Sequence, residues 1–207
     1  MPRKLTEQEE FWSESFGSDY LLRNQGEQLL AKNLVFFATA LRSLNSLESC
    51  LEMGANVGMN LEAIKLIFPN ANLYGVEINT EAANPLSRVI PKDNIFEGSF
   101  LDFKSDLKFD LVISKTVLIH INPEMLRHAY QALYETSLKY ILIAEYYNPT
   151  PVSVTYRGHE DRLFKRDFAG EMLDKYEDLS LVDYGFFYHR EDELYDDINW
   201  FLLKKSK

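Results

Sequence analysis

The stretch Glu52-Met-Gly-Ala-Asn-Val-Gly-Met-Asn60 decides the fold of this chain. A short apolar run, Cys50-Leu51, precedes it, and a helical pattern of apolar residues continues after it as far as Phe68. A strand, a glycine-bearing turn and a helix N-terminus in this order form a corner that suits nucleotide-like ligands. Because glycine lets the backbone come close to a ligand, we expect the N–H groups of the turn to point at one.

A second strand brings a carboxylate to the same place. The run Leu73-Tyr-Gly-Val-Glu-Ile78 predicts this strand, and Glu77 stands at its end. Ligands of parallel sheets bind beyond the carboxyl ends of the strands, where an acid can accept both hydroxyls of a ribose. The expected ligand therefore contains a ribose.

Two features of the turn distinguish between two classes of ribose-containing cofactor. The dinucleotide fingerprint requires glycine at its first, third and sixth positions. Counting from Gly54, this chain has Asn56 and Met59 where the second and third glycines belong. The preceding Glu52 would repel a pyrophosphate but suits an ammonium group or another cation. S-adenosylmethionine (SAM) carries an amino group and a sulfonium, so the turn favours SAM over a nicotinamide dinucleotide.

The composition limits the classes of partner. The chain has 207 residues, a net charge of −10 and one cysteine, Cys50, which fits a single domain without a disulfide framework. No cluster of lysine and arginine residues is long enough to follow a phosphate backbone, which argues against nucleic acid as a substrate or partner. The N-terminus lacks the apolar core of a signal peptide, and no apolar run reaches membrane-spanning length. We therefore expect a cytoplasmic protein with no membrane partner, and a homo-oligomer is compatible with the sequence.

Strands and helices alternate along most of the chain. The expected strands cover residues 47–53, 73–78, 94–98, 109–114 and 140–145, and the expected helices cover residues 59–68, 80–89 and 123–138. Residues 146–159 form an irregular stretch, residues 161–176 a helix, and residues 179–186 and 200–203 two closing strands. This pattern predicts an α/β fold, with a mostly parallel seven-stranded sheet, helices on both faces and a C-terminal antiparallel hairpin.

Several motifs of the central region resemble those of class I (Rossmann-like) SAM-dependent methyltransferases. Glu52-x-Gly54-x-Asn56-x-Gly58 stands for the first motif, Glu77 for the ribose acid, Gly98-Ser99-Phe100 for the segment beside adenine, and residues 109–114 for the fourth motif. The resemblance covers roughly residues 45–145, and Asn56 departs from it where glycine is common. The expected cofactor-binding residues are Tyr20, Arg23, Glu52, Gly54, Asn56, Gly58, Asn60, Glu77, Ile78, Ser99, Phe100 and Lys115.

The N-terminal region has two interpretations. Aromatic residues at Trp12, Phe16 and Tyr20 recur every four positions, as on one face of a helix. This face either packs on the core as a flap or forms a lid in which Tyr20 and Arg23 close over the amino-acid end of SAM. We expect residues 1–45 to contribute this cap and a first core helix to the same domain, and residues 46–207 to form the methyltransferase domain.

Three segments outside the central region give a narrower resemblance. They are residues 11–17, residues 148–151 with 156–159, and residues 163–170. Together they resemble bacterial methylases associated with pseudaminic acid biosynthesis. That resemblance implies an acidic nine-carbon sugar of surface glycans, or a precursor of one, as the methyl acceptor.

Methyl transfer from a sulfonium requires alignment, and a hydroxyl acceptor also wants a general base. His120, just past the fourth strand, is the first candidate base, and the alternative is a structural histidine that caps the helix at Asn122. Glu145, at the end of the fifth strand, is the second candidate, with a structural hydrogen bond as its alternative. Lys115 could instead orient an anionic substrate or form an ordinary ion pair.

A basic cluster in this acidic chain is the candidate acceptor site. The residues expected to bind the acceptor are Tyr156, Arg157, His159, Arg162 and Arg166 in this cluster, with Tyr146, Tyr147 and Asn148 on the wall next to the cofactor. Arginine binds carboxylates bidentately, and tyrosine stacks on sugar faces. The alternative is a helix laced by salt bridges, with Arg162 and Arg166 one turn apart. No residues have the spacing of zinc ligands, so we predict no metal.

The sequence thus predicts a SAM-dependent methyltransferase, O- or N-directed, that acts on a small molecule, with an acidic sugar or its precursor as the expected acceptor. Two alternatives stay open. The acceptor could be an unrelated small metabolite, or the chain could bind SAM as a regulatory protein without turnover.

Overall fold

The computed structural model describes residues 3–14, 17, 26–190 and 196–206. The helices are α1 (Glu7–Ser13), α3 (Glu27–Ala40), α4 (Met59–Ile67), α5 (Thr80–Leu86), α6 (Leu126–Thr136) and α7 (Phe168–Lys175), with short 3₁₀ turns η1 (Lys92–Asn94), η2 (Leu118–His120) and η3 (Pro123–Met125). The strands are β1 (Ser49–Met53), β2 (Asn72–Glu77), β3 (Ile95–Glu97), β4 (Phe109–Lys115), β5 (Ser137–Glu145), β6 (Val152–Tyr156), β7 (His159–Lys165), β8 (Leu179–Phe187) and β9 (Ile198–Lys205).

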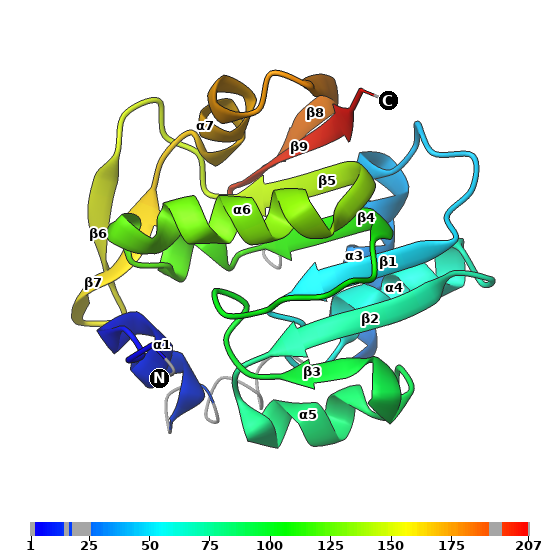
Figure 1. Cartoon of the computed structure of the whole chain (residues 1–207), viewed down its shortest axis with the longest axis horizontal. Helices are drawn as coiled ribbons and strands as arrows, with labels where there is room; N and C mark the ends of the chain where they lie inside the picture. The colour runs from blue at the N-terminus through cyan, green and yellow to red at the C-terminus, as the bar shows by residue number, and fades with distance from the viewer. Residues whose placement is uncertain (1–2, 15–16, 18–25, 191–195, 207) are drawn as a thin grey trace.

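The main sheet has seven strands in the order β3-β2-β1-β4-β5-β9-β8. The first five of these are parallel to one another. Strand β9 runs antiparallel between β5 and β8, so the C-terminal strands form a hairpin at one edge. Figure 1 shows this twisted sheet with helices in front of it and behind it. The α/β fold predicted from the sequence is confirmed.

Two apolar clusters hold the two faces of the sheet. Leu111 and Ile113 of β4 pack into the cluster that contains Phe36 of α3 and Ile64 of α4. Val112, between them, packs into the other cluster, with residues of α6 and α7. Successive side chains of a strand point to opposite faces, so a strand covered on both sides reads as an unbroken apolar run.

Local signals set the ends of several helices. The side chain of Asn79 caps α5 by accepting hydrogen bonds from the backbone N–H of Glu81 and of Ala82, at 2.9 and 3.3 Å. Pro69 follows the end of α4, as expected for a residue that cannot continue a helix. The predicted helix over residues 123–138 divides into η3 and α6, and Ser137 already belongs to β5.

The helix predicted over residues 161–176 is wrong in its first half. Residues 159–165 form β7, which pairs antiparallel with β6 in a separate two-stranded sheet, and only Phe168–Lys175 is helical. The spacing of Arg162 and Arg166 imitates a helix face, but Arg162 lies in β7 and Arg166 follows it. Pairing with β6 is a tertiary contact, which overrides a weak local preference.

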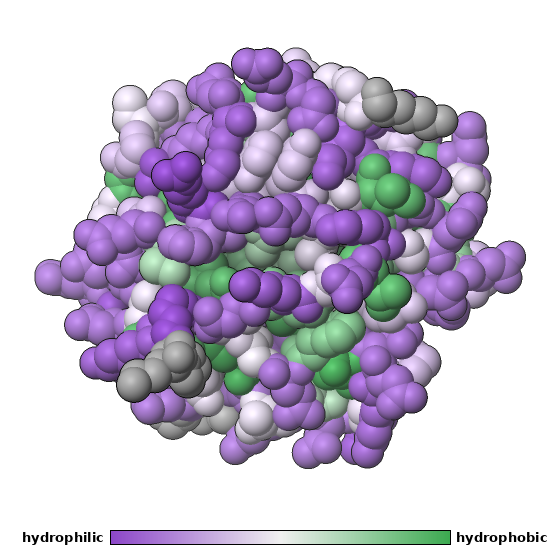
Figure 2. All heavy atoms as spheres, viewed as in Figure 1, coloured by the Kyte–Doolittle hydropathy of each residue, from purple (hydrophilic) through white to green (hydrophobic). Residues whose placement is uncertain are grey.

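Hydrophilic side chains cover most of the face seen in Figure 2, and apolar side chains show between them near its middle. Within the described ranges, no helix has the length and apolar character needed to cross a membrane.

We expect the stability of the fold to depend on the buried part of β5. Leu142 is fully buried, whereas Leu138 of the same strand is 53 % exposed. Leu142→Ala should lower the free energy of unfolding by about 2–5 kcal/mol, because it leaves a cavity in the core. Leu138→Ala should change it by about 0.5 kcal/mol or less. Urea unfolding measures both, and equal losses would contradict this packing.

Candidate functional site

A cavity of about 480 Å³ lies at the carboxyl ends of the parallel strands, which is within the usual size of small-molecule sites. Residues from the turns after β1, β2, β3 and β4 line it, together with residues of α1 and α3. The sequence-predicted residues among them are Gly54, Asn56, Asn60, Glu77, Ile78, Ser99, Phe100, Lys115 and His120. The fold thus brings nine of the candidates to one hollow.

The turn after β1 approaches its neighbours very closely. Gly54 has φ 76°, and a Cβ at this position would lie 2.6 Å from a methyl of Val117. The backbone N–H groups of Gly54 and Ala55 donate to the carbonyl of Val76, at 2.8 and 2.9 Å. Asn56, at φ 48°, donates its N–H to Glu77. The expectation that these N–H groups point at a ligand is therefore wrong for the first three residues of the turn.

The carboxylate of Glu77 joins two turns. One oxygen accepts from the N–H of Asn56 at 2.6 Å and the other from the N–H of Asn79 at 2.8 Å. Burial raises the pKa of Glu77, and the backbone hydrogen bonds oppose this rise. Glu77 lies on the cavity wall, so this carboxylate both shapes the turns and stays within reach of a ligand.

Glu52 lies one layer behind the wall. It is fully buried, and its Oε1 accepts from the side-chain amide of Asn60 at 2.6 Å. Its Oε2 is buried and has no hydrogen-bond partner among the described residues. Burial raises the pKa of Glu52 to about 8, while Asn60 and the nearby Lys115 act in the opposite direction. Burial also lowers the pKa of Lys115, which lines the cavity.

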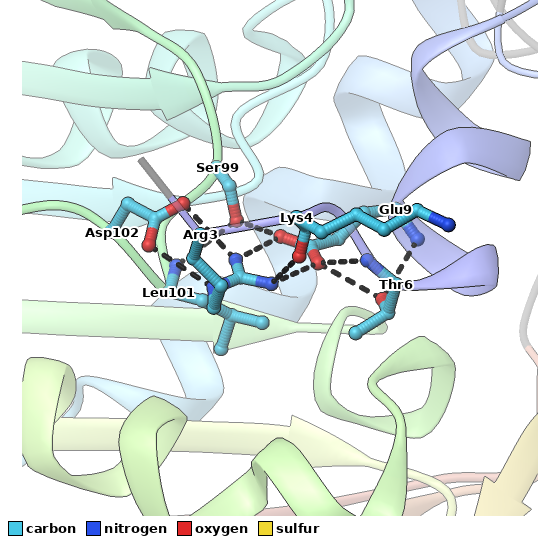
Figure 3. A network of polar contacts seen from close by, with 7 residues as sticks. All are labelled: Arg3, Lys4, Thr6, Glu9, Ser99, Leu101 and Asp102. Carbon is cyan, nitrogen blue, oxygen red and sulfur yellow. Dashed lines mark hydrogen bonds and ion pairs between the residues drawn. The ribbon is translucent and has the colours of Figure 1, made fainter. Parts of the chain in front are cut away.

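Helix α1 is fastened to the turn after β3 by a polar network (Figure 3). Glu9 accepts two hydrogen bonds from the guanidinium of Arg3, at 2.6 and 2.8 Å, and others from Thr6 and from the hydroxyl of Ser99. Arg3 also bonds to Asp102. Burial acts to raise the pKa of Glu9, but these hydrogen bonds hold it at about 2. Glu9 is therefore ionised, and it ties α1 to the segment that the sequence assigns to adenine.

The far end of α1 reaches the other side of the cavity. The ring of Trp12 lies 4.6 Å from the ring of His120, measured between centroids. The backbone carbonyl of Trp12 accepts from the side-chain amide of Asn79 at 3.3 Å. Gln8, Glu9 and Trp12 all line the cavity, so α1 covers it between the turns after β2, β3 and β4.

His120 is held in one tautomer. Its Nδ1 lies 2.6 Å from the carbonyl oxygen of Arg162, which can only accept, so Nδ1 carries the proton and Nε2 does not. Burial lowers the pKa of His120 to about 4. The imidazole is therefore neutral at physiological pH.

Glu145 does not line the cavity. Its carboxylate accepts from the hydroxyl of Ser114 at 2.7 Å and from the backbone N–H groups of Val117, Leu118 and Ile119 at 3.0–3.3 Å. Burial raises the pKa of Glu145 to about 7 against the effect of these bonds. The contacts correspond to the structural alternative, in which Glu145 shapes the segment that carries His120.

The other candidates lie away from the cavity lining or outside the described residues. Gly58, Tyr146, Tyr147, Asn148, Tyr156, Arg157, His159, Arg162 and Arg166 do not line it, and Tyr20 and Arg23 fall outside the described residues. Arg162 pairs with Glu7 at 3.5 Å, and Arg166 pairs with Glu171 at 2.6 Å. These two arginines thus neutralise carboxylates of the chain itself.

Several lining residues were absent from the sequence-based set. They include Gln8, Glu9, Trp12, Lys32, Asn33, Phe36, Asn79, Thr116, Val117 and Asp196. Asn79 had a signal, because an asparagine directly before a helix is a common cap. Thr6 and Glu9 form a capping box, which marks where α1 begins but gives no information about what the helix covers.

The sequence matches no family model and no curated protein. The fold, in contrast, matches solved structures. The 1,6-didemethyltoxoflavin-N1-methyltransferase of Burkholderia thailandensis, solved with its acceptor and S-adenosylhomocysteine (SAH), matches 100 % of this chain and 94 % of its own, with TM-score 0.72 and 13 % identity. The magnesium protoporphyrin IX methyltransferase of Synechocystis PCC 6803, solved with SAM, matches 99 % of this chain and 100 % of its own, with TM-score 0.66 and 13 % identity. The chain has the class I methyltransferase fold.

A third structure of this methyltransferase fold broadens the range of acceptors. A plantazolicin methyltransferase with SAH and an acceptor analogue matches 97 % of this chain and 95 % of its own, with TM-score 0.67 and 16 % identity. The three enzymes act on different small molecules or natural products and were crystallised with SAM or SAH. None of their names supports the narrower resemblance to pseudaminic acid methylases.

The buried carboxyl of Glu52 predicts a pH dependence of stability. Its pKa, about 8 in the fold, exceeds the ordinary value of 4.5, so between these values the folded chain binds more protons than the unfolded chain. The free energy of unfolding should therefore fall as pH rises from about 5.5 to 8. Glu52→Gln should reduce this fall by on the order of 2 kcal/mol, and the exposed control Glu81→Gln should not. Urea unfolding at both pH values tests this, and an unchanged fall in Glu52→Gln would contradict it.

Proposed function

We propose that the chain is a SAM-dependent methyltransferase that acts on a small molecule. The observation that carries this proposal is the meeting of the β1–α4 turn and the Glu77 carboxylate at one cavity. The solved structures of the same fold include methyltransferases with bound SAM or SAH, which supports it. A cavity of about 480 Å³ can enclose much of a ligand such as SAM.

The residues present fit SAM. Gly98, at φ 141°, lines the cavity, and a Cβ there would meet nothing within 4 Å, which leaves room beside Ser99 and Phe100 for a flat base. Glu77 would accept the ribose hydroxyls. Asn56 has a buried Oδ1 without a hydrogen-bond partner in the described chain, so it can receive a ligand donor. Asn60 and Lys115 would face the amino-acid end, with Glu52 behind them as the balancing carboxyl.

When bound, SAM supplies an electrophilic methyl group on a positively charged sulfur. The chain then has to align the acceptor, keep water out and, for a hydroxyl, receive a proton. Helix α1 covers the cavity and limits the access of water. His120 offers a neutral Nε2 that can accept a hydrogen bond or a proton from an acceptor O–H or N–H. Glu145 acts through the segment after β4, so we assign it a positioning role.

An acidic sugar as the acceptor stays a prediction. Its support from the sequence was the narrower resemblance of three segments together with the basic cluster, and the residues of that cluster do not line the described cavity. Two other cations, Lys32 and Lys115, do line it and could receive an anionic group. The alternative acceptor is an unrelated small metabolite. The comparison with solved enzymes supports this alternative, because none of the acceptors in their names is a sugar acid.

Calorimetry with SAM and SAH tests the cofactor assignment. Glu77→Ala should weaken binding of either compound by more than about 1 kcal/mol, since charged hydrogen bonds to the ribose are lost. The exposed Glu81→Ala, four residues further on, is the control and should bind as the natural chain does. Near-equal affinities of the two variants, with unchanged melting temperatures, would remove Glu77 from the site. Binding without turnover across hydroxyl and amine acceptors would favour the regulatory alternative.

A further inference from the structure

Two side chains present hydrogen-bond acceptors to the cavity from different elements. Gln8 belongs to α1 and His120 to η2, and both line the cavity. Each is buried, with 5 % of Gln8 and 8 % of His120 exposed. Neither residue belongs to the turns expected to hold the cofactor.

Both side chains are anchored by their donor ends to neighbouring residues of β7. The amide Nε2 of Gln8 donates to the carbonyl of Asp161 at 3.1 Å, and Nδ1 of His120 donates to the carbonyl of Arg162 at 2.6 Å. In a regular strand two successive carbonyls point in opposite directions. Asp161 has φ 53°, and the pairing of β6 with β7 shifts register between Val154 and Tyr156. This irregularity lets the two consecutive carbonyls of Asp161 and Arg162 point toward the same side of the strand, where they accept from Gln8 and His120.

The anchoring fixes which atoms remain for a ligand. The Oε1 of Gln8 is buried and has no hydrogen-bond partner in the described chain. Nε2 of His120 carries no proton, because Nδ1 holds it, so this atom can also only accept. A buried acceptor without a donor costs free energy, and native proteins tolerate few of them. The unpartnered Oε1 of Gln8, together with the unprotonated Nε2 of His120 on the lining of the same cavity, points to a ligand that brings donors.

A flat side chain stands next to this pair. Trp12 lies four residues after Gln8, on the same face of α1, and its ring is 4.6 Å from that of His120. Polar atoms fixed beside an indole ring suit a molecule with a flat face and donors on its edge.

We infer that Gln8 Oε1 and His120 Nε2 together receive two hydrogen-bond donors of the methyl acceptor. The acceptor class is thus a flat ring with two O–H or N–H groups along one edge, such as a phenol or a heterocyclic amide. A carboxylate at this end would meet two acceptors and no donor from the pair. This inference rests on the proposed methyltransferase function and names the substrate class of the same site.

Pairs of probes that differ only in their donors test the inference. We would titrate resorcinol against 1,3-dimethoxybenzene, and uracil against 1,3-dimethyluracil, into ¹⁵N-labelled protein saturated with SAH. In at least one pair the parent compound should bind about tenfold or more tightly than its methylated partner, because a site built for donors rejects their loss. It should also shift the ¹⁵N resonance of His120 Nε2. Equal affinities within both pairs, or no binding of any of the four probes, would overturn the inference.

Substitutions test whether Gln8 causes the preference for the parent compound over its methylated partner. Gln8→Met keeps the length of the side chain but removes its oxygen, and should reduce the preference for the parent compound at least about threefold. The control Gln131→Met, at an exposed position of α6, should leave it unchanged. If Gln8→Met binds SAH normally and keeps the full preference, Gln8 has no part in recognition. A chain that fails to bind SAH at all refutes the proposed function instead, so the two failures are distinguishable.

Discussion

The buried carboxylate of Glu77 is the contact on which the arrangement of the site depends. Two turns leave the sheet at neighbouring strands, and each gives it one backbone N–H, from Asn56 and from Asn79. Asn79 then caps α5 and holds the carbonyl of Trp12, so the same connection extends to α1. Glu77 thus connects the turns after β1 and β2 and, through Asn79, helix α1.

Charge inside the site is balanced over several layers. Glu52, Glu77 and Glu145 are buried at the carboxyl edge of the sheet, and burial raises the pKa of each. Lys115, half-buried on the cavity lining, lies near Glu52 and Glu145, and burial lowers its own pKa. Taking one more cationic group from a ligand would relieve this excess of acids, whereas a further anion near Glu52 would add to it. This electrostatic asymmetry suits a cofactor with an ammonium group and a sulfonium.

The sequence predicted the parts of the molecule that depend on local pattern. Apolar strands, the glycine turn and the prolines after helices predicted the sheet and most of the residues at its carboxyl edge that line the cavity, including Glu77 at the end of β2. The β6–β7 hairpin was missed because β6 is short and exposed, because β7 begins with charged and exposed residues, and because the spacing of Arg162 and Arg166 resembles a helix. Gln8 lies in the acidic run Glu7-Gln-Glu-Glu10, which reads as a solvated helix face. Only its packing against Asp161, far away in sequence, gives it a role.

Glu77 at the end of β2 is the residue that we propose to face the ribose of an adenosyl ligand. A crystal structure of the complex with SAH tests it most directly. We expect the adenosine in the described cavity, with its ribose hydroxyls within hydrogen-bond distance of Glu77 and its base next to Ser99 and Phe100. SAH bound elsewhere, or in this cavity with its ribose out of reach of Glu77, would contradict it.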